Sequence, residues 1–196
     1  MQEITKYITE NYLEVTAAIF GLIYVLLAAR QNFFCWMAGI ANVLIFAWIF
    51  FNSKIYANMS LQIIYLIISI YGLYVWMSKK PNVAVKISKM DNSYRLLMVV
   101  FISILTAISY LILSNTNSTT LFVDSFTAAA GLIATWMQAR KYIENWLIFI
   151  PTDIILTIMF YTQELYVTSA LFAIYTLIAI GAYFNWLKMY KKEQAN

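Results

Sequence analysis

Seven runs of about twenty mostly apolar residues follow one another through this chain of 196 residues. An α-helix needs about 20 apolar residues to cross the roughly 30 Å hydrocarbon core of a bilayer. Short polar stretches join the runs, and one longer polar segment separates the third from the fourth. The pattern predicts an all-α integral membrane protein with seven transmembrane helices. The expected spans are residues 10–29, 33–51, 56–77, 95–114, 119–139, 144–162 and 165–187.

The composition excludes a soluble globule, because 63% of the residues are hydrophobic and 11% are charged. The polar start of the chain leads into a full-length apolar run without a small-residue cleavage site, so we expect no cleaved signal peptide. Cys35 is the single cysteine and histidine is absent. We therefore expect no disulfide, no metal site and no cofactor. We assign the net charge of +4 to membrane topology and expect no nucleic-acid partner.

The basic residues divide unequally between the two sides of the membrane if the seven spans alternate in direction. Lys6 and Lys54 fall on one side, and all other Lys and Arg residues fall on the other. Cytoplasmic loops are enriched in Lys and Arg, so we expect the N-terminus outside and the C-terminus in the cytoplasm. The residues expected on the cytoplasmic side are Arg30, Lys79, Lys80, Lys86, Lys89, Arg95, Arg140, Lys141, Lys188, Lys191 and Lys192.

The chain resembles itself when it is shifted by 110 residues. The shift aligns acids, glycines, arginines and tryptophans in one ungapped register, which indicates a tandem duplication. Each unit holds three spans, and because the second unit starts four spans after the first, both cross the membrane in the same direction. We divide the chain into residues 1–79, 80–118 with the linking helix, and 119–196. Parallel repeats of this kind place substrate sites near the midplane between the halves, so we expect a transporter. The aligned pairs include Glu14 with Asp124, Gly21 with Gly131, Arg30 with Arg140, Trp36 with Trp146, Tyr65 with Tyr175, and Trp76 with Trp186.

Asp153 is the main candidate site residue. It lies nine residues past Glu144, about 13 Å into the sixth expected span. An ionised Asp at the bilayer centre costs about 2.5 to 3.5 kcal/mol, and no span carries a basic residue at its middle. Its partner is then either a proton or a cation that arrives from outside. The alternative is a protonated Asp153 that hydrogen-bonds to another helix.

Other polar residues are weaker candidates. Asn42 lies at a similar depth in the second span and either contacts substrate or bonds two helices together. Pro151, Thr152 and Thr157 are expected to form the wall of a polar pocket together with Asp153. We also include Gln62 from the third span.

Acids near the expected outer ends of two spans, Glu14 and Asp124, form either an outer vestibule for cations or solvated helix starts. Aromatic side chains within the spans attract cations and stack on flat heterocycles, although many of them serve only in packing. The aromatic candidates are Trp36, Trp136, Trp146, Phe149, Tyr65 and Tyr175.

The segments ARKYIENWL, IYGLYVW and VDSF resemble the PnuC family of bacterial vitamin transporters. The resemblance implies a SWEET-like arrangement of two three-helix bundles and a linking helix, a homotrimer, and the bacterial inner membrane. It also implies facilitated diffusion of an unphosphorylated vitamin, which a cytoplasmic kinase traps by phosphorylation. The nicotinamide riboside branch reads NWxxW with a later Asn, whereas this chain has Phe149 and Asp153 at those places. We therefore favour thiamine as the cationic substrate and keep nicotinamide riboside as the alternative.

Two other functions remain as hypotheses. A membrane-embedded enzyme is disfavoured, because the chain lacks histidine and lacks a pair of acids at catalytic spacing within one helix. A vitamin-binding subunit for a separate motor differs from a transporter by binding its ligand without flux.

Overall fold

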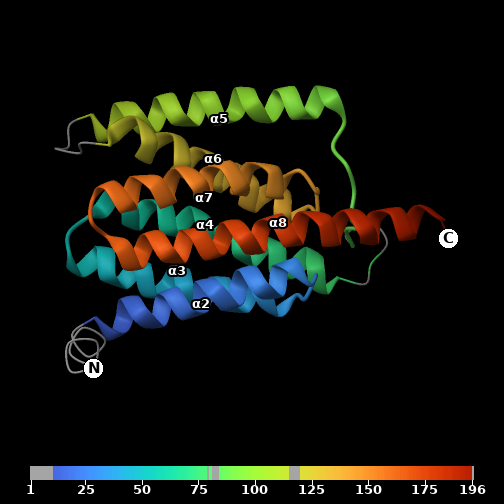
Figure 1. The fold of residues 1–196 in the computed structure, drawn as a ribbon, viewed down its shortest axis with the longest axis horizontal. Coiled ribbons are helices and arrows are strands. Elements are labelled where there is room, and N and C mark those ends of the chain that lie inside the picture. Colours follow the sequence, from blue (N-terminus) through green and yellow to red (C-terminus); the bar gives the residue numbers. More distant parts are fainter. Residues whose placement is uncertain (1–10, 79, 81–83, 115–119, 196) are drawn as a thin grey trace.

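The computed structural model describes residues 11–78, 80, 84–114 and 120–195. In this part of the chain, seven α-helices run roughly along one axis (Figure 1). The even-numbered helices run in one direction and the odd-numbered helices return, so the triplets α2–α4 and α6–α8 begin at the same end. The helices are α2 (Tyr12–Ala29), α3 (Phe34–Asn52), α4 (Tyr56–Met77), α5 (Asn92–Leu113), α6 (Leu121–Ala139), α7 (Asn145–Thr162) and α8 (Tyr166–Ala195).

The prediction of seven helices is confirmed, and six of them are long and apolar enough to cross a membrane. The exception is α6, which has no stretch of 18 residues as apolar as those in the other six helices. It is also the most enclosed helix, with buried residues that include Ser125, Thr135 and Gln138. Because neighbouring helices cover these polar side chains, α6 needs less apolar surface than a lipid-facing helix.

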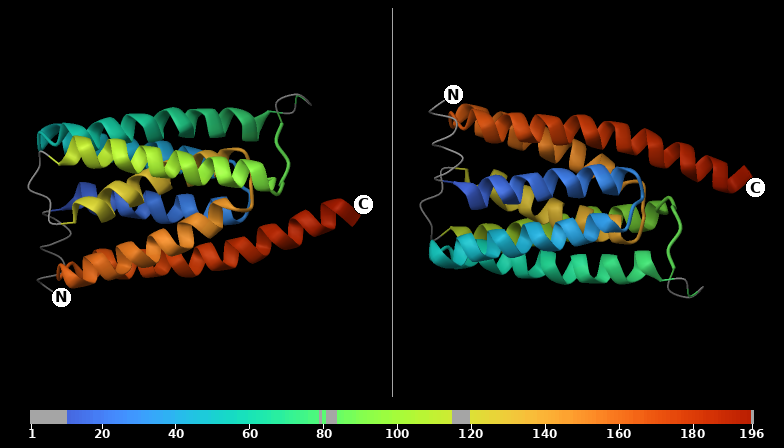
Figure 2. Two further views of the ribbon diagram at one scale, coloured as in Figure 1. Left: turned by 90° about the horizontal axis from the view of Figure 1, so that it is seen from above. Right: turned by 90° about the horizontal axis from the view of Figure 1, so that it is seen from below.

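The two ends of the bundle differ in charge. We call the end that holds the turns 30–33 and 140–144 and the segment 84–91 the basic end, and the other the opposite end. The helix α8 continues beyond its expected end at residue 187 and projects from the basic end with Lys188, Lys191 and Lys192 (Figure 2). Residues 1–10, with Lys6, and Lys79 lie outside the described part of the chain.

The backbone has matching turns 110 residues apart. Gln31 and Lys141 have φ angles of 58° and 57°, and Lys54 and Glu164 have φ angles of 60° and 61°. Each residue follows a helix end, where a left-handed residue lets later N–H groups reach the last carbonyls. The N–H of Asn32 accordingly donates to Leu27 O, and the N–H of Tyr142 donates to Met137 O.

Contacts between the two triplets also come in matching pairs. α2 packs against α8, and α4 packs against α6. A Cβ added to Gly21 of α2 would lie 2.7 Å from Tyr175 Oη, and one added to Gly131 of α6 would lie 2.5 Å from Tyr65 Oη. Glycine at these positions therefore lets a tyrosine of the other triplet pack directly on the helix backbone.

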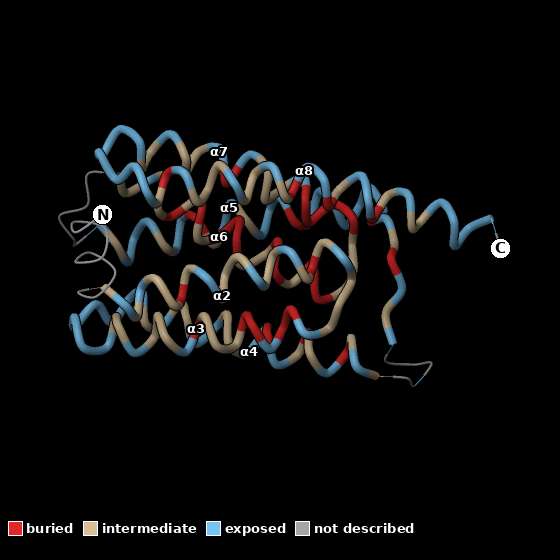
Figure 3. Tube along the Cα trace, turned by 60° about the horizontal axis from the view of Figure 1, so that its bottom comes forward, coloured by how far each residue is buried: buried red, intermediate tan, exposed pale blue. Residues whose placement is uncertain are grey.

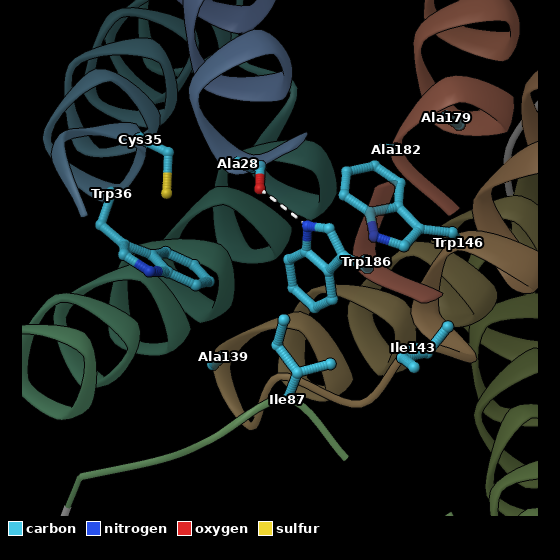
Figure 4. Packing of buried hydrophobic residues seen from close by; sticks show 10 residues of the cluster. All are labelled: Ala28, Cys35, Trp36, Ile87, Ala139, Ile143, Trp146, Ala179, Ala182 and Trp186. Atoms are coloured by element: carbon cyan, nitrogen blue, oxygen red, sulfur yellow. Dashed lines mark hydrogen bonds between the residues drawn. The ribbon is translucent and has the colours of Figure 1, made fainter. Parts of the chain in front are cut away.

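Four tryptophans pack together near the basic end of the bundle. Many buried residues gather there (Figure 3), and Figure 4 shows Trp36, Trp146 and Trp186 of this cluster. Trp36 and Trp76 meet edge to face at 5.6 Å, Trp146 and Trp186 do so at 5.5 Å, and Trp76 and Trp186 are 6.1 Å apart between ring centroids. The indole N–H of Trp186 donates to Ala28 O at 3.2 Å (Figure 4). This tryptophan cluster joins both triplets.

The segment 84–91 is tied to the turn between α6 and α7. The N–H of Ser88 donates to Lys141 O at 3.1 Å, and the N–H of Ile143 donates to Ser88 O at 3.0 Å. Glu144 accepts hydrogen bonds from Met90 N and from Arg95 at 2.7 Å. This segment therefore closes over the basic end, where Ile87 is buried in the same core as the tryptophans.

Candidate functional site

A cavity of about 1020 Å³ lies inside the bundle, and residues from α2, α3, α4, α6, α7 and α8 line it. Its lining residues at the opposite end include Glu14, Tyr166 and Val167, which are exposed. At the basic end the lining includes Gln138 and Trp146, which are buried. The cavity is therefore open toward the opposite end and closed toward the basic end by the tryptophan cluster.

Eight of the twelve residues predicted for the site or its vestibule line this cavity. They come from helices that are far apart in the sequence, so the bundle brings them together. They are Glu14, Asn42, Gln62, Tyr65, Trp146, Phe149, Asp153 and Tyr175.

The other four predicted residues, Trp36, Trp136, Thr157 and Asp124, do not line the cavity. Trp36 is fully buried in the tryptophan cluster, and Trp136 packs against Tyr142.

The side chains of Thr157 and Asp124 each form a hydrogen bond with a residue four positions away in the sequence. The hydroxyl of Thr157 donates to the backbone carbonyl of Asp153, a common bond of a threonine to its own helix. Asp124 accepts a hydrogen bond from Thr120 at the start of α6, as expected for a helix-start acid. The hydroxyl of Thr152 likewise donates to the backbone carbonyl of Ile148, and Pro151 is exposed. Of the predicted pocket wall at residues 151–157, Asp153 alone lines the cavity.

Asp153 is 8% exposed and lies near the middle of α7. Among the described residues, no hydrogen bond or ion pair reaches its carboxylate, and no Lys or Arg lines the cavity. The alternative in which Asp153 bonds to a neighbouring helix is therefore not realised here. A carboxylate that lines a cavity without a protein partner has room for a ligand or a proton.

Asn42 joins two helices, which is one of the two roles considered for it. Its amide Nδ2 donates to Ala17 O at 2.7 Å and so joins α3 to α2. The same residue lines the cavity, which leaves its role in substrate binding as a prediction.

Several polar lining residues were not predicted from the sequence. Tyr24 of α2 donates a hydrogen bond of 2.7 Å to Gln138 Oε1 of α6. Ser69, Thr135 and Thr168 also line the cavity. The sequence signal that could have identified these residues is a polar side chain within a mostly apolar helix. Gln138 has this signal, although it lies near the end of its helix.

The fold and cavity define a multi-pass helical membrane protein with an internal site for a small molecule. The sequence profile of the family described as "Nicotinamide mononucleotide transporter" matches residues 11–188, so the chain belongs to this family.

Relatives of known function support the same assignment. The chain is 26% identical over 204 residues to the nicotinamide riboside transporter PnuC of Escherichia coli (strain K12), covering 90% of this chain and 85% of the relative. It is 20% identical to the protein of that name from Neisseria mucosa, covering 94% and 75%. The crystal structure of the vitamin B3 transporter PnuC has the same fold, with a TM-score of 0.73 and 19% identity, and the match covers 96% of this chain and 87% of that one.

These comparisons correct the substrate preference. The relatives are named nicotinamide riboside transporters, so the preference for thiamine that rested on Phe149 and Asp153 is not supported. Because the relatives are transporters, the interpretation that the chain is not an enzyme stands.

Proposed function

We propose that this protein transports nicotinamide riboside across a membrane by facilitated diffusion. The observation that carries the proposal is the carboxylate of Asp153, which has no protein partner and lies on the wall of a cavity that is closed at the basic end. Nicotinamide riboside carries a permanent positive charge on its pyridinium ring. A cation beside Asp153 would compensate a buried charge that the lining residues leave uncompensated.

The aromatic lining supports a flat cationic substrate. Tyr65, Trp146, Phe149 and Tyr175 come from both triplets and line the same cavity as Asp153. Aromatic faces attract cations by about 0.5 to 2 kcal/mol each, depending on solvation. These rings can therefore stack on a pyridinium ring whose charge lies near the carboxylate.

We further propose a 3+1+3 SWEET-like architecture in which α2–α4 and α6–α8 rock against each other around the cavity. The matching turns at Gln31 and Lys141 and the matching glycine–tyrosine contacts support two equivalent halves. Both triplets begin at the opposite end, as parallel repeats require.

We also propose that the protein lies in the bacterial inner membrane, which the family resemblance supplies, with the basic end in the cytoplasm, which the distribution of Lys and Arg supports. A homotrimer and trapping of the product by a kinase are parts of the proposal that the family resemblance supplies.

The test is uptake by liposomes that contain the purified protein, without ATP or an ion gradient. We expect uptake of labelled nicotinamide riboside and much less uptake of thiamine. Binding without uptake would favour the vitamin-binding subunit, and preference for thiamine would overturn the proposed substrate.

Asp153→Asn should weaken binding of nicotinamide riboside by at least about 30-fold, because removing one partner of a desolvated charge pair costs about 2 kcal/mol or more. The uncharged reduced form, dihydronicotinamide riboside, should lose much less affinity. Asp91→Asn, at an acid outside the cavity, is the matched control. An equal loss for both ligands would contradict the charge pairing.

A further inference from the structure

The amide of Gln138 is an unusual feature of the cavity wall. Gln138 is 1% exposed and lines the cavity one residue before the end of α6. Its Oε1 accepts the hydrogen bond from Tyr24, whereas its Nε2 is buried without a hydrogen-bond partner. A buried donor without a partner costs about 1 to 3 kcal/mol, so this N–H group is expected to serve a ligand.

Tyr24 holds the amide in this orientation. Its ring meets Trp36 edge to face at 5.8 Å, and its Cδ2 lies 3.0 Å from where a Cβ of Gly39 would be. The ring is thus packed against Trp36 and Gly39 of α3, which fixes the position of its hydroxyl. Because that hydroxyl binds Oε1, the two N–H groups of Nε2 are directed away from Tyr24.

The buried end of the cavity is rich in donors. Trp146 Nε1 is a second buried donor without a partner, and Trp146 lines the same cavity. Asp153, an acceptor, lies eight residues or about 12 Å from the start of α7, whereas Gln138 lies about 1.5 Å from the end of α6. Along the bundle axis the acceptor and the Gln138 donor are therefore about 10 Å apart, a distance comparable to the length of a nucleoside.

We propose that Gln138 Nε2 donates a hydrogen bond to an uncharged oxygen of the substrate, and that Tyr24 positions the amide for it. This inference rests on the proposed function. The cationic ring then lies toward Asp153, and an oxygen acceptor, either the carboxamide or the 5′-hydroxyl of the ribose, lies toward the basic end. The polarity of the cavity thereby orients the substrate and selects ligands that carry both groups.

The test compares ligands that lack one oxygen acceptor. Binding of nicotinamide riboside, pyridinium riboside without the carboxamide, and the 5′-deoxy analogue is measured by calorimetry on the purified protein. Gln138→Met keeps the side-chain length and removes the donor. It should weaken nicotinamide riboside binding about 3- to 30-fold and leave one analogue nearly unaffected. The insensitive analogue identifies the oxygen that Gln138 contacts.

Two further variants separate this role from a structural one. Tyr24→Phe frees the amide to rotate and should reproduce the same ligand pattern with a smaller loss. Gln31→Met also removes a buried amide nitrogen without a hydrogen-bond partner, but Gln31 does not line the cavity, so the affinity of this variant for nicotinamide riboside should stay unchanged. Equal loss for all three ligands, or no loss, in Gln138→Met would overturn the inference.

Failure of the proposed substrate gives a different result. If the unmodified protein bound thiamine and no pyridinium riboside, the substrate proposal would fail. The role of Gln138 would then be decided with thiamine and its analogue without the hydroxyl group, by the same comparison.

Discussion

Replacing Gly72 by alanine forces a methyl group into the face of a buried indole. A Cβ added at Gly72 on α4 would lie 2.5 Å from Trp36 Cδ2 and Cζ2. Carbon atoms without a bond between them rest at about 3.5 to 4.0 Å, so the overlap is about 1 Å. Trp36 is 0% exposed, and Trp76 and Tyr24 pack against its ring at 5.6 and 5.8 Å. The indole has little space to move away.

The expected cost follows from comparison with a second glycine. Overpacking of a core costs about 1 to 3 kcal/mol, and glycine to alanine in a helix gains up to about 1 kcal/mol. Gly181 of α8 provides the control, because no atom lies within 4 Å of its added Cβ. Gly72→Ala should therefore be about 1 to 3 kcal/mol less stable than Gly181→Ala. For a chain of this size the difference corresponds to roughly 3 to 10 °C in unfolding temperature.

The measurement is thermal unfolding of both variants in the same detergent, followed by near-ultraviolet circular dichroism of the tryptophans. Combining Gly72→Ala with Trp36→Leu should cost less than the sum of the two single changes, because the smaller side chain leaves room for the methyl group. Equal unfolding temperatures for Gly72→Ala and Gly181→Ala would refute the reasoning.

Two further predictions concern the basic end. Glu144→Ala removes the acceptor for Met90 N and Arg95. Amide hydrogen exchange in the segment 84–91 should therefore accelerate about 5- to 30-fold, while exchange in α2 stays unchanged. Unchanged exchange in the segment would show that the carboxylate does not hold it in place. Lys141 lies over the ring of Trp76 at 4.6 Å, and burial lowers its pKa below the ordinary value of 10.5. The unfolded chain then binds more protons in the interval between the lowered pKa and 10.5, so stability should rise with pH there. Lys141→Met should reduce this increase of stability with pH, which can be measured as unfolding midpoints between about pH 8 and 10.5. An unchanged slope in the variant would assign the pH dependence to another group.

The helices could be predicted closely from the sequence because apolar length and polar interruptions decide them locally. The expected span 56–77 coincides with α4, and the expected span 119–139 differs from α6 by two residues at its start. The larger miss is the end of α8, which continues to Ala195. Most of its last residues, from Lys188, are charged or polar, and most have good helix propensity, so the helix continues beyond the apolar run.

The candidate site was predicted in part. Asp153, Asn42 and Gln62 were found because a polar side chain within an apolar span is costly wherever the span lies, and all three line the cavity. Trp36 and Trp146 occupy equivalent positions of the internal repeat, yet Trp146 lines the cavity and Trp36 does not. Equivalence in sequence does not decide the direction in which a side chain faces once the two halves pack together.

The sequence by itself determined the membrane class, the helices, the internal resemblance and the isolated acid, because each depends on the hydropathy or spacing of residues along one segment. The tertiary structure alone decided which side chains share the cavity, that the cavity closes at the tryptophan cluster, and that Tyr24 occupies one side of the Gln138 amide. These features depend on contacts between different helices, of which Tyr24 and Gln138 are 114 residues apart, and no local pattern in the chain encodes the distance or the orientation of such contacts.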